Sequence, residues 1–213
     1  MIRKHNLAAG FTAVVLAATG AVATAPGAQA SAPHERARTT SLADVLAADG
    51  HGFDKNSRDF DILERAVLTV LKAKPNSPVG LLAKKNVRLT AFLPTDNAFR
   101  DLAKRLTGKD PRTERATFAV LAKAAGVDVI ETVLLYHVVP GKTLGAAKVI
   151  RADGKKLTTA QGGTITVQVK GHKVILVDAD PDLANPRVIV TDINKGNPQI
   201  GHAINRVLLP IDL

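Results

Sequence analysis

Two kinds of hydrophobic periodicity divide the chain near Pro140. Before this residue, apolar side chains recur at helical spacing. The clearest case has its apolar positions at Ile62, Leu63, Ala66, Val67, Val70 and Leu71. This i, i+1, i+4, i+5 pattern predicts a helix with one buried face. After Pro140 the period falls to two, which predicts strands. A helical first part followed by a mainly stranded second part indicates an α+β domain.

Capping residues and turn formers bound the elements of the first part. Serine, threonine and aspartate accept hydrogen bonds from free N–H groups at a helix start, and glycine suits the position after a helix end. Beside the helix described above, the expected helices are one capped by Ser41, one capped by Ser77, one running from Thr95 to Gly108, one over 116–125, and one over 129–135 after Asp128. Between the second and third of these, alternating residues 87–93 predict a strand that Pro94 stops.

The second part contains five expected strands, separated by glycine-containing turns. They are residues 156–160, 164–170, 173–177, 187–193 and 202–209. The second and third flank Gly171-His172, where glycine supplies the positive φ that a two-residue hairpin loop needs. No internal repeat is visible, so the pattern predicts one copy of one domain.

The first 30 residues have the pattern of a secretory signal peptide. Arg3 and Lys4 precede an apolar run, and Ala28-Gln29-Ala30 offers a small-x-small cleavage site. An uncleaved anchor is the alternative, because the run approaches the ~20 residues that span a bilayer. Its many Ala, Gly and Thr residues make it weakly apolar, which favours cleavage. We therefore expect a signal peptide over 1–30, a disordered leader over 31–40 and a folded domain over 41–213.

Charge and composition narrow the partners. The net charge is +10, and the signal holds two basic residues and no acid, which leaves +8 on residues 31–213. This surplus favours anionic partners such as cell-envelope polymers, although solubility alone explains it equally well. Aromatic residues are 3% of the chain and tryptophan is absent, which argues against stacking on nucleic-acid bases. Without cysteine, no disulfide and no thiol chemistry is expected.

Motifs for catalysis and metal binding fail on inspection. Residues 178–182 (Asp-Ala-Asp-Pro-Asp) begin like a calcium loop, but Leu183 and Ile189 stand where that loop needs Gly and Glu. A solvated loop is the simpler interpretation. No two of the six histidines are spaced i, i+4, and no nucleophile or dinucleotide motif is present. We therefore expect no catalytic residue, no metal and no cofactor.

Three separated blocks resemble the signatures of the fasciclin domain. The matching residues of the first block are Thr90, Phe92, Pro94, Thr95, Ala98 and Phe99, and those of the last are His202, Val207, Leu208, Leu209 and Pro210. Between them, residues 135–141 resemble the family's tyrosine–histidine motif through Tyr136 and His137. The resemblance covers residues 40–213, with Asn205 standing where the family usually has aspartate. It implies an α+β fold, a β-wedge or sandwich of about six to seven strands with the N-terminal helices packed along one side.

The resemblance also implies a role in adhesion or interaction outside the cell. In animal members the tyrosine–histidine motif is associated with integrin binding, but the signal peptide here is of bacterial type, so only the position of the motif is transferred. Tyr136 and His137 are thus a candidate recognition motif, while a neutral core histidine is the competing interpretation of both His137 and His202. Residues 107–127 form a longer segment than the family leads us to expect, and a function private to this chain could reside there.

The expected function is that of a secreted, non-enzymatic interaction module at or near the cell surface. Two alternatives stay open: a polyanion-binding envelope protein, and a carrier of a small apolar ligand. Lysine and arginine gathered on one face would favour the first alternative. A deep apolar pocket with few polar groups would favour the second. The partner is expected to be an extracellular protein or an anionic envelope polymer, without specific nucleic-acid binding and without a membrane span after cleavage of the signal.

Overall fold

The computed structural model describes residues 39–48 and 50–211, so the expected signal peptide and most of the leader lie outside it. Its elements, in chain order, are α1 (Leu42–Leu46), α2 (Asp61–Ala73), the 3-10 helix η1 (Pro78–Ala83), β1 (Leu89–Pro94), α3 (Asp96–Thr107), α4 (Glu114–Tyr136), β2 (Val138–Pro140), α5 (Ala146–Ile150), β3 (Lys156–Thr158), β4 (Thr164–Lys170), β5 (Lys173–Val177), β6 (Val188–Ile193) and β7 (Gln199–Ile204). The α+β class is confirmed. Within the described residues, no helix is both long and apolar enough to cross a membrane.

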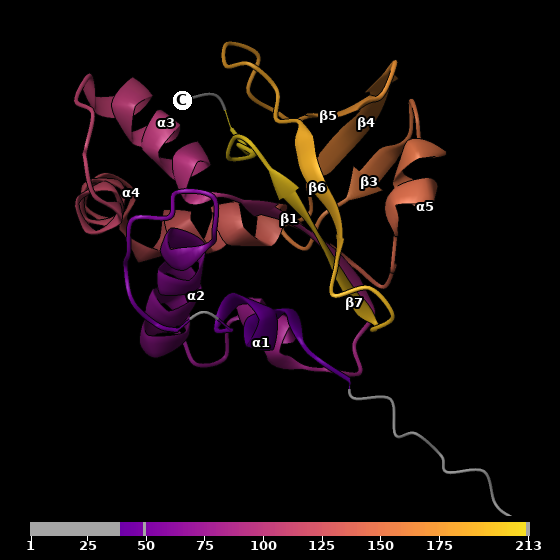
Figure 1. Cartoon of the computed structure of the whole chain (residues 1–213), viewed down its shortest axis with the longest axis horizontal. Helices are drawn as coiled ribbons and strands as arrows, with labels where there is room; N and C mark the ends of the chain where they lie inside the picture. The colour runs from indigo at the N-terminus through magenta and orange to yellow at the C-terminus, as the bar shows by residue number, and fades with distance from the viewer. Residues whose placement is uncertain (1–38, 49, 212–213) are drawn as a thin grey trace, which may run out of the picture. The chain divides into compact units, whose positions relative to one another are not determined.

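Two sheets form the stranded part of the domain. The first, sheet A, has the order β2-β1-β7-β6, with β1 and β7 parallel and the other pairs antiparallel. The second, sheet B, has the antiparallel order β3-β4-β5. Hydrogen bonds join the sheets at both sides: Ala160 N donates to Val138 O (2.7 Å) and Leu176 N donates to Pro186 O (2.9 Å). Figure 1 shows α1 to α4 on one side of β1 and β7, and sheet B with α5 on the other.

Strand β1 is buried on both faces, and this divides the interior into two cores. Leu89, Ala91 and Leu93 pack with the helices, while Phe92 packs with sheet B. The alternation in the sequence was therefore a correct sign of a strand. Its polar positions do not face solvent, however, because all six residues of β1 are buried. The strand separates one apolar core from the other.

Strand β7 lies three residues earlier in the chain than the 202–209 strand that the periodicity predicts. The observed strand includes Gly201, which sits in its middle and is buried. A Cβ atom at Gly201 would stand 2.6 Å from Leu93 Cδ1 and 3.3 Å from Leu42 Cδ2. The glycine is thus required by the close approach of β1 and α1 to this strand.

The expected caps of α1 and α3 differ in outcome. Ser41 and Asp44 form the predicted capping box, with Asp44 N donating to Ser41 Oγ (3.1 Å) and Ser41 N donating to Asp44 Oδ2 (2.9 Å). Gly108 ends α3 in the left-handed conformation (φ 68°), as predicted. Thr95 occupies the N-cap position of α3 but makes no capping hydrogen bond through its side chain, so that expected bond is wrong.

The start of α3 is satisfied by backbone groups instead. Asp96 N donates to Asp59 O (3.2 Å) and Asn97 N donates to Ser57 O (2.9 Å). These carbonyls belong to the loop before α2, which lies against the start of α3. Because the loop supplies the acceptors, the Thr95 hydroxyl is not needed for the cap.

The two helices expected between residues 116 and 135 form one bent element, α4. Gly126 (φ 71°, ψ 171°) interrupts the helical backbone at the bend, a conformation that glycine adopts without strain. Thr113 caps the first arm, with Ala116 N donating to its Oγ1 (3.2 Å). Asp128, expected to cap the second arm, lies within it, and its carboxylate pairs with Lys74.

Two short elements, β2 and α5, were not predicted, and most strands are shorter than the periodicity suggests. The hairpin at Gly171 is confirmed, with Lys170 opposite Lys173 across the loop. Seven strands in two sheets agree with the six to seven that the fasciclin resemblance implies.

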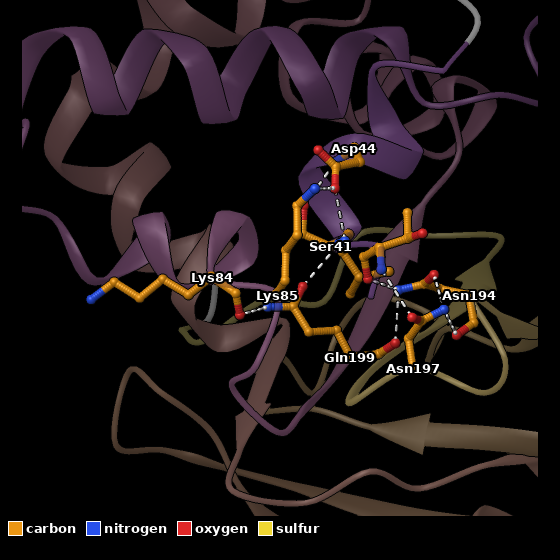
Figure 2. A network of polar contacts seen from close by, with 9 residues as sticks. Ser41, Asp44, Lys84, Lys85, Asn194, Asn197 and Gln199 are labelled. Atoms are coloured by element: carbon orange, nitrogen blue, oxygen red, sulfur yellow. Dashed lines mark hydrogen bonds and ion pairs between the residues drawn. The ribbon is translucent and has the colours of Figure 1, made fainter. Parts of the chain in front are cut away.

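Amide side chains of β7 and of the loop before it hold the start of the described chain in place (Figure 2). Gln199 is fully buried, and its Oε1 accepts a hydrogen bond from Leu42 N (2.7 Å). Its Nε2 donates to Leu81 O (2.8 Å) and Lys84 O (2.9 Å). The Nδ2 of Asn194 donates to the backbone carbonyl of Thr40 (2.8 Å). A single glutamine thus connects β7 to α1 and η1.

Candidate functional site

An apolar groove with a volume of about 480 Å³ lies between α3, α4 and the chain that follows β7. Its larger side chains are Phe99, Leu102 and Leu106 of α3, Phe118, Leu121 and Ile130 of α4, and Leu209 and Ile211 near the C-terminus. Among the described residues that line it, none carries a formal charge, and His137 and Thr132 are the polar ones. Leu106, Val129 and Ile211 stay more than 40% exposed, so the groove opens to solvent through large apolar side chains.

One side of the groove comes from the segment 107–127, which the sequence marked as longer than expected. Its residues 114–125 form the first arm of α4 and place Phe118, Leu121 and Ala122 in the lining. The sequence predicted a helix over residues 116–125. It could not show that the apolar face of this helix stays partly open, because an apolar helix face is normally covered by the core.

His137 lies at the inner end of the groove, at the junction of α4 and β2, and only 4% of it is exposed. Its Nδ1 bonds to Val133 O (2.7 Å), so this nitrogen carries the proton. Its Nε2 accepts a hydrogen bond from Leu208 N (2.9 Å). Burial lowers the pKa of His137 to about 4. The ring is therefore neutral, and protonation of Nε2 would break the bond to Leu208.

Tyr136 points into the other core, between the two sheets, and is 1% exposed. Its hydroxyl donates to Thr164 O (2.8 Å), and burial raises its pKa to about 12. The side chains of the tyrosine–histidine motif thus lie on opposite sides of sheet A. Neither is an exposed recognition edge, and of the two alternatives the geometry matches the buried one.

His202 has the second buried imidazole. Its Nε2 bonds to Leu144 O (2.7 Å), and Asp192 N donates to its Nδ1 (3.4 Å). Burial lowers its pKa as well, so this ring is also neutral. Both histidines are occupied by backbone groups, which leaves neither ring available as a general base.

The other signature residues lie in the interior. Thr90, Phe92, Pro94, Thr95, Ala98, Phe99, Val207, Leu208 and Leu209 are buried, and Pro210 is partly buried. Thr90 shows why a polar residue is needed in such a place: its Oγ1 donates to Lys142 O (2.7 Å) and accepts from Leu144 N (2.9 Å). At Asn205 the side chain accepts a hydrogen bond from Arg187 N (2.7 Å), a bond that needs no charge.

A cluster of carboxylates, which the sequence did not predict, lies where α2, α3 and α4 begin. The acid cluster consists of Asp54, Asp59, Asp61, Asp96 and Glu114. Ligand oxygens of Asp54, Asp59 and Asp61 lie within 4.8 Å of one another, and so do those of Asp59, Asp96 and Glu114. Backbone amides orient it: Asp54 N donates to Asp61 Oδ2 (3.1 Å) and to Glu114 Oε2 (2.7 Å). Burial raises the pKa of Asp96 and of Glu114, and the carboxyl of Asp59 raises that of Asp96 further.

Basic residues gather at the opposite end of the domain, around sheet B. Residues 141–177 contain seven lysines and arginines and one aspartate. Lys156, Lys170 and Lys173 are exposed, and Lys170 stands directly opposite Lys173. Like charges in this position repel each other, so the hairpin keeps them at some cost in stability.

The segment 178–182, interpreted from the sequence as a solvated loop, is more ordered than that. Asp180 is buried, and its Oδ1 accepts hydrogen bonds from Asp182 N (2.9 Å) and Leu183 N (2.8 Å). Asp178 Oδ2 accepts from Leu209 N (2.9 Å), and burial raises the pKa of Asp178 to about 6. Asp178 ties the loop to the C-terminal segment, and Asp180 orders the loop itself. The segment is a loop, as expected, with Ala179, Pro181 and Asp182 exposed, but Asp180 is buried.

The fold defines the class of protein: an α+β domain of two linked sheets with helices along one side. Residues 67–210 match the model of the Fasciclin domain family, and the chain belongs to this family. Its members are generally interaction modules rather than enzymes, are often related to adhesion, and are typically extracellular or surface-associated.

Two further comparisons complete this picture. No curated protein matches the chain. Among solved structures, it is similar to a FAS1 domain pair from the insect cell adhesion molecule Fasciclin I, with 15% identity and a TM-score of 0.44. The match covers 68% of this chain and 44% of that one, so the chain spans less than half of the insect pair.

Proposed function

We propose that this chain is an exported, non-enzymatic binding module that acts outside the cell and takes a small apolar guest in the groove between α3 and α4. The groove carries the proposal. Its volume of about 480 Å³ falls in the range of about 300–1,000 Å³ that is typical of small-molecule sites. An uncharged, largely aliphatic lining suits a neutral hydrocarbon or ring system.

The polar groups at the groove support binding rather than catalysis. His137 is the titratable side chain in the lining, and both of its ring nitrogens are bonded to the backbone. A general base must be free to accept a proton from its substrate. The imidazole in this position stabilises the end of the groove instead.

Export is the second half of the proposal and rests on the signal pattern of residues 1–30. N-terminal sequencing of protein from the culture medium or cell surface checks it. A mature chain that begins near Ser31 is expected. A full-length chain that detergent alone releases from the membrane would contradict the proposal.

Binding in the groove is tested with N-phenyl-1-naphthylamine, a neutral probe whose fluorescence rises in apolar sites. The chain has no tryptophan and one tyrosine, so its own emission is weak. We expect saturable binding at one site per chain. Leu106→Gln should weaken it about tenfold, because a polar amide would replace an apolar side chain at the mouth of the groove.

Leu68→Gln is the matched control for this experiment. Leu68 lies on α2 outside the groove and is 42% exposed, against 43% for Leu106, so both variants should fold alike. Equal affinity of the two variants, or no saturable binding by the parent, would overturn the groove as a ligand site. A third result is possible: the parent does not bind the probe but retains an envelope protein, and Leu106→Gln abolishes this retention. The occupant of the groove would then be a protein and not a small molecule.

A second candidate function has its own observation, the basic surface of sheet B. Lys156, Lys170 and Lys173 lie at exposed positions of neighbouring strands, which favours an anionic envelope polymer as partner. Replacing all three by glutamine should lower the salt concentration at which the protein elutes from immobilised heparin. The control replaces the exposed Lys84, Lys109 and Lys123, which removes the same charge elsewhere. Equal shifts would show that net charge alone, and not this surface, causes retention.

A further inference from the structure

Two oxygens of the acid cluster have no hydrogen-bond partner although they are buried: Asp59 Oδ1 and Asp96 Oδ2. Asp96 is 1% exposed. Its other oxygen accepts from Ile62 N (2.9 Å), so the side chain is held in place, and a carboxylate oxygen of Asp96 lies within 4.8 Å of oxygens of Asp59 and Glu114. A buried carboxylate oxygen without a partner is costly, and native structures rarely leave one without a reason.

Two arginines and a histidine of this region interact with other groups. Arg65 and Arg115 lie over the ring of Phe53, at 5.3 and 5.4 Å from its centre. The nearby His51 pairs with Glu64 at 2.5 Å. Within the described part of the chain, Asp59, Asp96 and Glu114 form no ion pair with a basic side chain.

Helix N-termini account for part of the arrangement only. Asp61, Asp96 and Glu114 each lie in the first turn of a helix, where the helix dipole favours a negative charge. That effect stabilises each acid separately. It does not explain why three helices direct their first carboxylates at one another, because mutual repulsion then opposes the dipole.

We propose that Asp59, Asp96 and Glu114 bind a divalent cation, with Ca²⁺ as the preferred ion and the exposed Asp54 on the solvent side of the site. The ligands would all be oxygen atoms, the set that calcium, magnesium and manganese prefer. Two oxygens on one Ca²⁺ stand about 2.4 Å from the ion and thus at most about 4.8 Å apart. The ligand oxygens of the three residues fall within this separation. Calcium accepts flexible coordination, whereas magnesium demands a near-ideal octahedron, so ligands drawn from three separate segments favour calcium.

Such an ion would connect three segments that are separated in the sequence. Asp59 belongs to the loop before α2, Asp96 begins α3 and Glu114 begins α4. Helices α3 and α4 are also the two sides of the apolar groove. Calcium bound at their N-termini would fix the spacing of these sides, whatever the groove holds. The inference stands independently of the function proposed for the groove.

Isothermal titration with CaCl₂, after removal of metal with EGTA, tests the proposal. We expect about one Ca²⁺ per chain, with a dissociation constant of about 1 mM or lower, and a rise in the melting temperature on adding calcium. Asp96→Asn should weaken binding at least about tenfold, because one ligand charge is lost. Glu114→Gln, a second variant of the site, should do the same. Asp101→Asn is the matched control, since Asp101 is exposed on the same helix as Asp96.

Three outcomes would overturn the site. One is the absence of both binding heat and a melting shift at about 5 mM CaCl₂, a concentration above the usual range of extracellular sites. Another is unchanged affinity in Asp96→Asn and Glu114→Gln, which would place the ion elsewhere. The third is a stability of the parent that falls as the pH is raised, to the same extent with and without calcium. That result would show that Asp59 and Asp96 share a proton and not a metal ion.

Discussion

His137 and the acid cluster are both buried polar sites, and they differ in how their atoms are satisfied. Each ring nitrogen of His137 has a backbone partner at hydrogen-bond distance. In the acid cluster, Asp59 Oδ1 and Asp96 Oδ2 have none. The histidine lies at the edge of an apolar groove, and the acids lie beneath three helix starts, yet burial alone does not distinguish the two.

The difference teaches where binding should be sought. A polar side chain whose bonds are complete contributes to the fold and offers nothing to a ligand. A buried carboxylate with a free oxygen either holds a proton or awaits a cation. By this criterion the tyrosine–histidine motif, which the sequence suggested as a recognition site, is structural. The acid cluster, which the sequence did not predict, is the better candidate for a binding site.

The largest effect is expected for His137→Ala. The change leaves Leu208 N–H and Val133 C=O without their partner and opens a cavity, so the free energy of unfolding should fall by about 3 kcal/mol. His172→Ala, in the exposed hairpin turn, should change it by less than about 0.5 kcal/mol. Urea unfolding at neutral pH measures both. Similar midpoints for the two variants would contradict the claim that the hydrogen bonds of His137 stabilise the fold.

The pH dependence of His137 should be nearly as large. Its pKa is about 4 in the folded protein, against an ordinary value of 6.5, so the unfolded chain binds the proton more readily. The contribution is fully present above pH 6.5 and is lost as the pH falls towards 4, to an extent on the order of 3 kcal/mol. The difference in unfolding free energy between the parent and His137→Gln, measured between about pH 7 and pH 4, isolates this residue. A difference that does not change with pH would contradict the neutral histidine.

The acid cluster should show the opposite sign. The pKa of Asp96 is raised by burial and by Asp59, so in the absence of metal the parent loses stability as the pH rises above the unfolded value of 3.8. Asp96→Asn removes that loss and keeps the acceptor for Ile62 N–H. With EGTA present, the variant should exceed the parent by on the order of 2 kcal/mol at about pH 8 and by less at about pH 5. Chemical denaturation at both pH values checks this, and a less stable variant at pH 8 would refute the uncompensated charge.

The smallest effect is expected at two helix starts, where one threonine side chain makes a hydrogen bond and the other makes no capping bond. Thr113 caps α4 through its side chain, whereas Thr95 stands at the N-cap of α3 without such a bond. Thr113→Val should therefore cost about 1 kcal/mol, and Thr95→Val less than about 0.5 kcal/mol. Melting curves of the two valine variants decide the order. Equal losses would mean that the hydroxyl of Thr95 contributes in a way that the backbone caps do not replace.

The sequence predicted the elements whose signals are local. The capping box at Ser41, the glycine end of α3 and the hairpin at Gly171 each depend on residues a few positions apart, and all three are present. The position of β7 was not predicted correctly, because the strand contains a glycine. The contacts that require glycine at position 201 come from Leu93 and Leu42, which are far away in the chain. No pattern along the chain reports such a contact.

The candidate site was harder to predict for the same reason. The apolar side chains of the groove have the spacing of ordinary core positions, and only the packed structure shows that Leu106 and Val129 remain exposed. The acid cluster draws on residues from 54 to 114, each of which looks like a common acid near a helix start. Convergence of separate helices is a tertiary property, so the sequence alone could not reveal either site.

The parallel pairing of β1 with β7 has a consequence for the order in which the protein folds. It joins residues 89–94 to residues 199–204, across more than half of the described chain, and β1 is the strand on which both cores are built. Pairs so distant in sequence close slowly, because the intervening chain must lose much of its freedom before the contact forms. A chain emerging from the ribosome cannot complete the central sheet until residues 199–204 are available, so the nascent chain should stay open to unfolded-chain binding factors until that strand has been released.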